Sequence, residues 1–292
     1  MTPVRLSLLS AALLAPIPSF AAEDVVTIPS PGGEIVATLS LPEGDPAPVV
    51  LLLHGFTGSR NELSTESVPE GIFARTAARL ADAGYASLRV DFRGSGESLA
   101  DLTFAETTFE GQTADALAAL EYLSAHEGVA GDDIFVIGWS QGGLVATAAA
   151  GRSDLPDAVA LWAAVATPPS TYAGILGADL VDAAIAGDAD TVHAVTLPWG
   201  AEIELKGAFF DGVATFDPAA EIADYAGPLF VAQGSLDDTV PPASAEVLIA
   251  AHDGPEELWV AEMDHVFNAF STDETLEAMI AATIAYFDAH AD

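Results

Sequence analysis

Short runs of mainly apolar residues alternate with longer helical stretches along this chain, and this alternation limits the fold more than any other feature. Three such runs, Val49–Leu53, Ala86–Val90 and Asp133–Ile137, have the length of strands. Helical patterns at Gly71–Ala83 and Phe109–His126 separate them. Buried strands that are joined by helices form a parallel sheet. The sequence therefore predicts an α/β protein with a mostly parallel central sheet flanked by helices.

The remaining segments extend this pattern and interrupt it once. Early strands are expected at Val25–Ile28 and Glu34–Leu41, and the second alternates in polarity as an antiparallel or edge strand does. Further predicted elements are three buried strands and two helices: Ala158–Ala163, Leu229–Ala232, Leu258–Ala261, a helix starting near Leu144, and Thr272–Ala289. Between about residues 167 and 217, proline and glycine break the rhythm. We expect a small insertion there, at the sheet edge where the loops after parallel strands bind ligands.

The first 21 residues have the features of a secretory signal peptide. Arg5 precedes an apolar run, Leu6–Leu14, and the segment ends at Ser19-Phe20-Ala21, with small residues at the positions that precede cleavage. A transmembrane helix is the alternative, but the run is shorter than the roughly 18 apolar residues required and is broken by Pro16 and Pro18. We expect residues 1–21 to be removed, leaving one domain over residues 22–292 in a secreted protein, either periplasmic or extracellular.

The charge balance excludes several kinds of partner. The chain has 8 Lys and Arg against 44 Asp and Glu, a formal net charge of −36, which repels nucleic acids and anionic membranes. Such a surface is either adapted to high salt or simply that of an acidic secreted protein. The sequence has no cysteine, which excludes disulfides, thiolate metal sites and a thiol nucleophile. The chemistry must use oxygen or nitrogen groups.

The pentapeptide Gly138-Trp139-Ser140-Gln141-Gly142 directly follows a predicted strand and precedes a predicted helix. In that setting a sharp turn lifts a serine hydroxyl clear of the backbone, and the glycines leave room for the turn. The alternative is an ordinary turn in which the serine only caps the helix. The pattern indicates Ser140 as a nucleophile, which a neighbouring base must activate.

His265 is the candidate for that base, because its loop follows the last predicted strand and projects from the same sheet edge as Ser140. The other five histidines lie in different settings: His54 in a glycine-containing loop, His126 and His252 at helix ends, His193 in the insertion, and His290 near the last residue. An acid must orient the imidazole, and both Asp237 and Asp238 follow a predicted strand. Either aspartate gives the chain order serine, aspartate, histidine.

The negatively charged intermediate of acyl transfer requires two fixed N–H donors. The backbone N–H of Gln141, the residue after the nucleophile, supplies one. We expect the second from Phe56 in the loop His54-Gly55-Phe56-Thr57-Gly58, which leaves a buried strand. Four aromatic residues are candidates either for binding an aromatic acyl group or for the core: Trp139, Trp199, Phe209 and Phe210.

Four segments carry a family resemblance: His54-Gly55-Phe56-Thr57-Gly58, Asp91-Phe92-Arg93-Gly94-Ser95-Gly96-Glu97-Ser98, Gly138-Trp139-Ser140-Gln141-Gly142-Gly143 and Asp264-His265-Val266-Phe267. Together they resemble the α/β-hydrolase fold and, within it, bacterial feruloyl (cinnamoyl) esterases. The resemblance runs from about Val49 to the C-terminus and is weakest in the insertion. It implies Ser140 as nucleophile, His265 as base, and the backbones of Phe56 and Gln141 as oxyanion donors.

The resemblance also selects between the two aspartates. The family's acid stands midway in the pattern Gly-x-x-Asp-x-x-Val, which is Asp237 rather than Asp238. The family carries a small insertion over its active site, in keeping with the break in the pattern between about residues 167 and 217. The chain departs from the family where Trp139 precedes the nucleophile, a position that is often histidine. This departure leaves the triad intact but changes the packing beneath the turn that carries Ser140.

The resulting hypothesis is a secreted serine hydrolase that cleaves carboxylic esters through an acyl-enzyme, with a small feruloyl-type or other ester as substrate and no cofactor. Alternatives with the same triad are a short-chain lipid or polyester esterase and a serine aminopeptidase. A non-catalytic binding module is the alternative from another class. Dinucleotide binding is not expected, since Leu99 stands where the third glycine should be, and neither a phosphate-binding loop nor a zinc motif is found.

Overall fold

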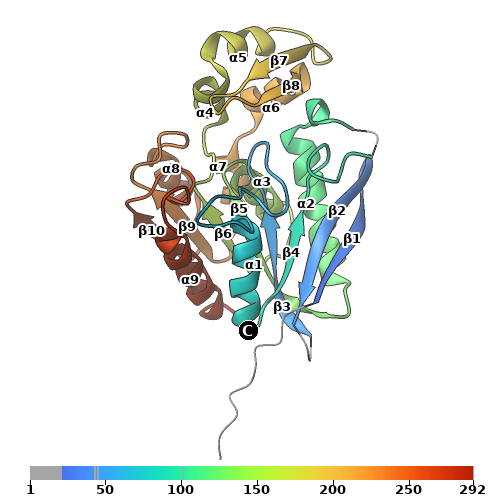
Figure 1. Cartoon of the computed structure of the whole chain (residues 1–292), viewed down its shortest axis with the longest axis vertical. Coiled ribbons are helices and arrows are strands. Elements are labelled where there is room, and N and C mark those ends of the chain that lie inside the picture. The colour runs from blue at the N-terminus through green and yellow to red at the C-terminus, as the bar shows by residue number, and fades with distance from the viewer. Residues whose placement is uncertain (1–21, 43, 45, 101, 292) are drawn as a thin grey trace, which may run out of the picture.

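A computed structural model of the chain describes residues 22–42, 44, 46–100 and 102–291. The predicted signal peptide, residues 1–21, lies outside this part. Within it, an eight-stranded sheet has the order β1-β2-β4-β3-β5-β6-β9-β10 (Figure 1). The strands are β1 (Ala22–Ser30), β2 (Gly33–Leu41), β3 (Ala47–Leu53), β4 (Ala86–Val90), β5 (Val129–Trp139), β6 (Ala158–Trp162), β9 (Leu229–Gly234) and β10 (Glu256–Ala261). The β1–β2 and β2–β4 pairs are antiparallel, and the other neighbouring pairs are parallel.

Helices cover both faces of this sheet (Figure 1). One face packs against α2 (Phe109–Ser124), α3 (Gln141–Gly151), α7 (Pro218–Ala223) and α8 (Ala243–Ala251), and the other against α1 (Ile72–Asp82) and α9 (Glu274–Asp288). Successive residues of a strand point to opposite faces. Leu51 and Val136 therefore join the first core, and Leu52 and Ile137 join the second. This explains why the central strands are continuous apolar runs.

The strands and long helices predicted from the sequence are present, with ends that differ by a few residues. One prediction was wrong: the strand at Leu258–Ala261 is not buried. It belongs to β10, which lies at the edge of the sheet, and Leu258 and Val260 are 44% and 56% exposed. An edge strand has a neighbour on one side only, and its apolar content does not distinguish it from a central strand.

The insertion is more regular than its proline and glycine content suggests. Its elements are α4 (Pro168–Leu176), α5 (Ala178–Ile185), a hairpin of β7 (Val192–Thr196) and β8 (Glu202–Lys206), and α6 (Gly207–Thr215). They form a lobe above the sheet, at the end opposite the C-terminus (Figure 1). Buried Tyr172 and Phe209 join the core on the α2 side, so the insertion and the sheet share one hydrophobic core.

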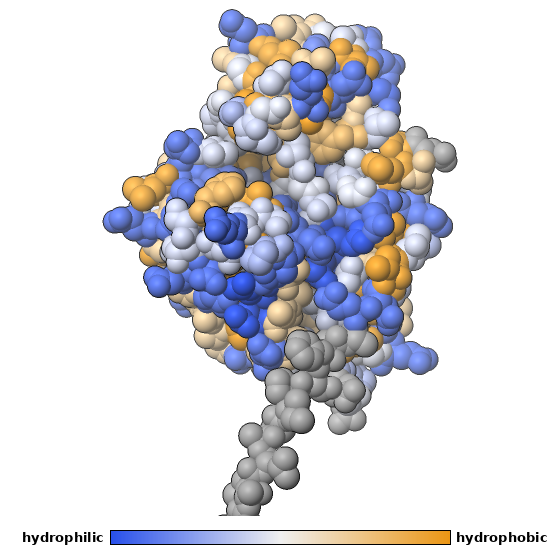
Figure 2. All heavy atoms as spheres, in the orientation of Figure 1, coloured by the Kyte–Doolittle hydropathy of each residue, from blue (hydrophilic) through white to orange (hydrophobic). Residues whose placement is uncertain are grey.

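The surface agrees with the composition. Hydrophilic residues cover most of the face in Figure 2, as the net charge of −36 leads one to expect. In the part of the chain that the structure describes, no helix has the length and apolarity of a membrane span.

Candidate active site

Ser140 lies in a tight turn between β5 and α3, with a φ of 56°. This left-handed backbone conformation is rare for a residue with a side chain, and it is maintained by close packing around the turn. A Cβ on Gly138 would lie 2.4 Å from the carbonyl oxygen of Gly142, and a Cβ on Gly142 would lie 1.9 Å from that of Leu53. The glycines of the pentapeptide are therefore required by backbone contacts on both sides of the serine.

Replacing Gly142 with alanine is expected to destabilise the fold by about 3 kcal/mol or more, because the new methyl group overlaps the carbonyl of Leu53 in the central sheet. Gly174→Ala is a matched control: Gly174 lies in α4 with no atom near its Cβ position, and this change should add about 0.5–1 kcal/mol of stability. Urea unfolding of the two variants measures both effects. Equal stabilities would show that the packing around Ser140 is not as described.

The structure brings Ser140, His265 and Asp237 together in one chain of hydrogen bonds. The Ser140 hydroxyl donates to Nε2 of His265 at 3.0 Å, and Nδ1–H of His265 donates to Oδ2 of Asp237 at 2.8 Å. Asp237 follows β9 and His265 follows β10, so both loops leave the carboxyl ends of parallel strands, as Ser140 does. The Ser140 residue is 8% exposed and the His265 side chain 16% exposed, so both are largely shielded from water.

The structure shows which of the two candidate aspartates contacts His265. Asp237 is buried, and its Oδ1 accepts hydrogen bonds from the backbone N–H groups of Thr239 at 3.0 Å and Val240 at 2.8 Å. These bonds turn Oδ2 toward His265. Asp238 is exposed. The carboxylate that contacts the imidazole is therefore that of Asp237, the residue selected by the family pattern.

The two predicted oxyanion donors, Gln141 and Phe56, belong to segments that adjoin Ser140. Gln141 is the first residue of α3, where backbone N–H groups have no partner within the helix and the helix dipole is positive. Phe56 follows Gly55, and a Cβ on Gly55 would lie 3.4 Å from Cβ of Ser140. The Phe56 loop therefore lies directly against Ser140. Within the described residues, neither N–H donates to another protein group.

Aromatic side chains join the Phe56 loop to the insertion. The Phe56 ring packs on Phe104 at 5.6 Å between centroids, on Tyr172 at 5.5 Å and on Phe209 at 5.7 Å. The Tyr172 hydroxyl donates to the side chain of Gln141, which donates to Gln112 at 2.7 Å. Burial raises the pKa of Tyr172 well above its ordinary value, so this hydroxyl keeps its proton. These contacts fix both donor residues relative to the insertion.

The four aromatic candidates for acyl binding differ in how exposed their side chains are. Trp139 is 5% exposed, its Nε1–H donates to the carbonyl of His265 at 3.2 Å, and it packs beneath the histidine loop. Trp199 is 57% exposed at the turn between β7 and β8. Phe209 and Phe210 are fully buried. Trp139 therefore supports the loop of His265, and a role for Trp139 or Trp199 in acyl binding stays a prediction.

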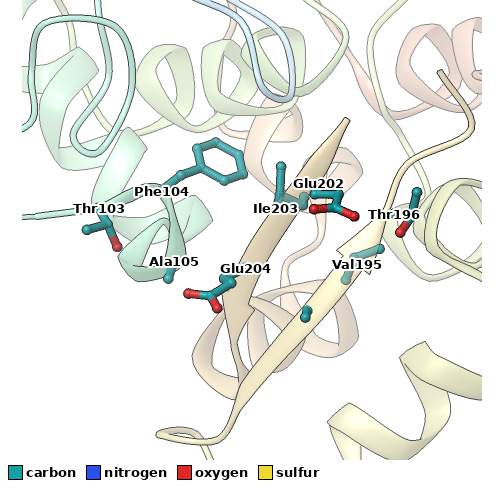
Figure 3. A pocket seen from close by; sticks show the side chains of 9 residues that line it. Thr103, Phe104, Ala105, Val195, Thr196, Glu202, Ile203 and Glu204 are labelled. Carbon is teal, nitrogen blue, oxygen red and sulfur yellow. The ribbon is translucent and has the colours of Figure 1, made fainter. Parts of the chain in front are cut away.

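A cavity of about 500 Å³ lies between the hairpin of the insertion and the short helix η1 (Phe104–Glu106). Figure 3 shows Phe104 on one side of it, and Glu202, Ile203 and Glu204 of β8 on the other. None of the triad residues lines this cavity. Phe104 does line it, and the Phe104 ring also packs on Phe56. The cavity is therefore one side chain away from the oxyanion loop.

The sequence did not predict the two buried side chains that lie beneath the loop of Phe56. The His54 ring lies beneath it, and burial lowers the pKa of His54. The carboxyl group of Glu62 also lies there, and burial raises its pKa to about 8. Glu62 stands four residues after Gly58 in a segment that reads as a polar loop. No local signal in the sequence marks it as buried.

Comparison with known proteins agrees with this architecture. The protein family described as "alpha/beta hydrolase fold" matches residues 48–201, just over half of the chain. No curated protein sequence matches the chain significantly. Among solved structures, Est1E from Butyrivibrio proteoclasticus with ferulic acid bound has a TM-score of 0.70 and 22% identity, over 91% of this chain and 98% of that protein.

Two further solved structures show how broad this similarity is. The esterase domain of a Rhodothermus marinus protein has a TM-score of 0.66 and 24% identity, over 91% of this chain and 97% of that domain. The acylaminoacyl peptidase of Pyrococcus horikoshii has a TM-score of 0.70 and 17% identity, over 94% of this chain but 42% of that protein. At these identities the likeness shows the fold alone. From the family match and the shared fold, this chain belongs to the alpha/beta hydrolase fold family.

Proposed function

We propose that this protein is a serine hydrolase that cleaves carboxylic esters through an acyl-enzyme. The observation that carries the proposal is the continuous hydrogen-bond chain from Ser140 through His265 to Asp237, at 3.0 and 2.8 Å. Its components have the geometry in which a histidine takes the proton of a serine hydroxyl while a buried carboxylate orients the imidazole. The backbone N–H groups of Phe56 and Gln141 complete the set as donors for the oxyanion.

The reaction follows from these positions in two steps. Oγ of Ser140 attacks the carbonyl carbon as His265 takes the hydroxyl proton, and the carbonyl oxygen becomes an oxyanion held by the two N–H groups. The intermediate collapses with loss of the alcohol, which takes the proton from His265, and an ester to Ser140 remains. Water then attacks this ester in the same way, with His265 as base, and releases the acid and free Ser140.

We further propose an aromatic acyl group, such as feruloyl or cinnamoyl, for the substrate. Two observations support this choice: the half-buried rings of Phe56 and Phe104, which pack on each other beside the predicted oxyanion loop, and the cavity beyond Phe104. Flat aromatic surfaces pack well against such rings. The sequence resemblance to feruloyl esterases points the same way, and Est1E is a protein of this fold with ferulic acid bound.

A comparison of three substrates tests the proposal: methyl ferulate, p-nitrophenyl butyrate and an aminoacyl anilide, with labelling by a fluorophosphonate as a measure of the nucleophile itself. We expect labelling, and a higher kcat/KM for methyl ferulate than for either of the others. A preference for the butyrate indicates a short-chain esterase, and a preference for the anilide indicates an aminopeptidase. No labelling and no turnover would contradict the serine mechanism and favour a binding module.

A further inference from the structure

The carboxyl group of Glu62 lies against the loop that carries Phe56. Its side chain is 5% exposed, and Oε1 accepts a hydrogen bond from the backbone N–H of Gly55. A Cβ on Gly58 would lie 2.2 Å from the same oxygen, so the carboxyl group occupies the space that this glycine leaves. The φ of Glu62 is 56°, a strained conformation for a residue with a side chain. The loop is therefore built around this carboxyl group.

His54 holds the other side of Gly55. Its Nδ1–H donates to the carbonyl of Gly55 at 2.8 Å, and its Nε2 accepts from the backbone N–H of Phe92 at 3.1 Å, which defines a neutral ring. The peptide unit is planar and trans, so fixing the carbonyl of Gly55 fixes the direction of the Phe56 N–H. Glu62 holds the N–H of Gly55 and His54 holds its carbonyl, and together they orient the oxyanion donor.

Gly55 also separates Glu62 from the nucleophile. A Cβ on Gly55 would lie 3.4 Å from Cβ of Ser140 and 3.6 Å from Oε1 of Glu62. A negative charge on Glu62 would therefore repel the oxyanion that forms at Ser140, in a site where little water screens it. A neutral carboxyl group accepts the same hydrogen bond from Gly55 without this repulsion.

The surroundings of Glu62 keep its carboxyl group neutral at pH 7. Burial raises the pKa of Glu62 to about 8, hydrogen bonds from Gly55 and Leu63 lower it in part, and the charge of Asp91 adds to the rise. The neutral His54 ring has its Nδ1 3.9 Å from the carboxyl oxygen. The nearest cation in sequence, Arg60, is paired with Asp91 and Glu97. On the Ser140 side of Gly55, the charged or titratable groups are His265, which contacts Ser140, and Asp237, which contacts His265.

We propose that Glu62 is a positioning residue of the oxyanion loop, and that its carboxyl group must be uncharged for the tetrahedral intermediate to form at Ser140. Glu62 acts through the backbone of Gly55 and Phe56 and does not touch the substrate. The inference rests on the proposed function, because it requires an oxyanion at Ser140. It predicts that activity falls as the pH rises through the range in which Glu62 ionises.

The test measures kcat and KM for p-nitrophenyl butyrate between pH 6 and pH 9.5, for the wild type, Glu62→Gln, Glu62→Leu and Glu66→Gln. Glutamine keeps an acceptor oxygen and cannot ionise, leucine removes the acceptor, and Glu66 is an exposed carboxyl group in the same segment. We expect kcat of the wild type and of Glu66→Gln to fall by about tenfold or more above pH 8 with little change in KM. Glu62→Gln should not show this fall. Glu62→Leu should lower kcat by about 10- to 100-fold at every pH.

Several results would overturn the proposal. An alkaline fall in Glu62→Gln equal to that of the wild type would do so, as would wild-type kcat in Glu62→Leu. If a variant does not fold, the wild type alone is decisive, because a constant kcat from pH 7 to pH 9.5 contradicts the inference. Fluorophosphonate labelling separates this failure from that of the proposed function. A wild type that neither labels nor turns over contradicts both, and one that does both without the expected fall contradicts only the role of Glu62.

Discussion

Ser140→Ala is expected to lower kcat for ester hydrolysis by about 10⁵- to 10⁶-fold, the loss seen when the nucleophile of a serine triad is removed. Without the hydroxyl there is no oxygen to form the acyl-enzyme, and His265 loses the proton donor 3.0 Å from its Nε2. Residual activity can then come only from binding and the oxyanion donors. Rates with p-nitrophenyl butyrate and labelling by a fluorophosphonate measure this loss, and the variant should take up no label.

Two comparisons make this result specific. Ser124→Ala removes the hydroxyl of an exposed serine at the end of α2, and it should label and turn over like the wild type. Alanine has a Cβ as serine does, so the φ of 56° at position 140 is equally strained in both and the fold should be retained. Circular dichroism checks this. Turnover of Ser140→Ala within tenfold of the wild type would contradict the assignment of the nucleophile.

Asp237→Asn is expected to lower kcat by about 10⁴-fold. Oδ1 of Asp237 already accepts two backbone N–H groups, from Thr239 and Val240. In the variant the amide oxygen keeps these bonds and the NH₂ group faces His265. The imidazole must then accept at Nδ1 and carry its proton on Nε2, the wrong tautomer to take a proton from Ser140.

The neighbouring aspartate supplies the control for this prediction. Asp238→Asn makes the same chemical change on an exposed side chain, and kcat should stay within about twofold of the wild type. Assays of both variants near pH 7 give the comparison. Equal losses, or a greater loss in Asp238→Asn, would mean that the acid is wrongly assigned.

The order of secondary-structure elements could be predicted because each element follows from local pattern. The strands β3, β5 and β6 are apolar along their central residues and buried on both faces, and α1 and α9 end where the helical pattern ends. The position of a strand within the sheet was harder to predict. Leu258 and Val260 have the composition of a buried strand, yet they lie at an edge, because burial depends on which strands pair and not on the strand's own residues.

The sequence by itself identified Ser140, His265 and two neighbouring candidate aspartates, since the loops after parallel strands must meet at one edge of the sheet, and the family pattern selected Asp237. Only the tertiary structure decided what surrounds these residues. It turned Oδ2 of Asp237 toward His265, placed Trp139 beneath the histidine loop, and buried Glu62 under Gly55. The physical reason is that segments far apart in the chain bury these residues and supply their hydrogen-bond partners. The local sequence pattern does not specify which segments these are.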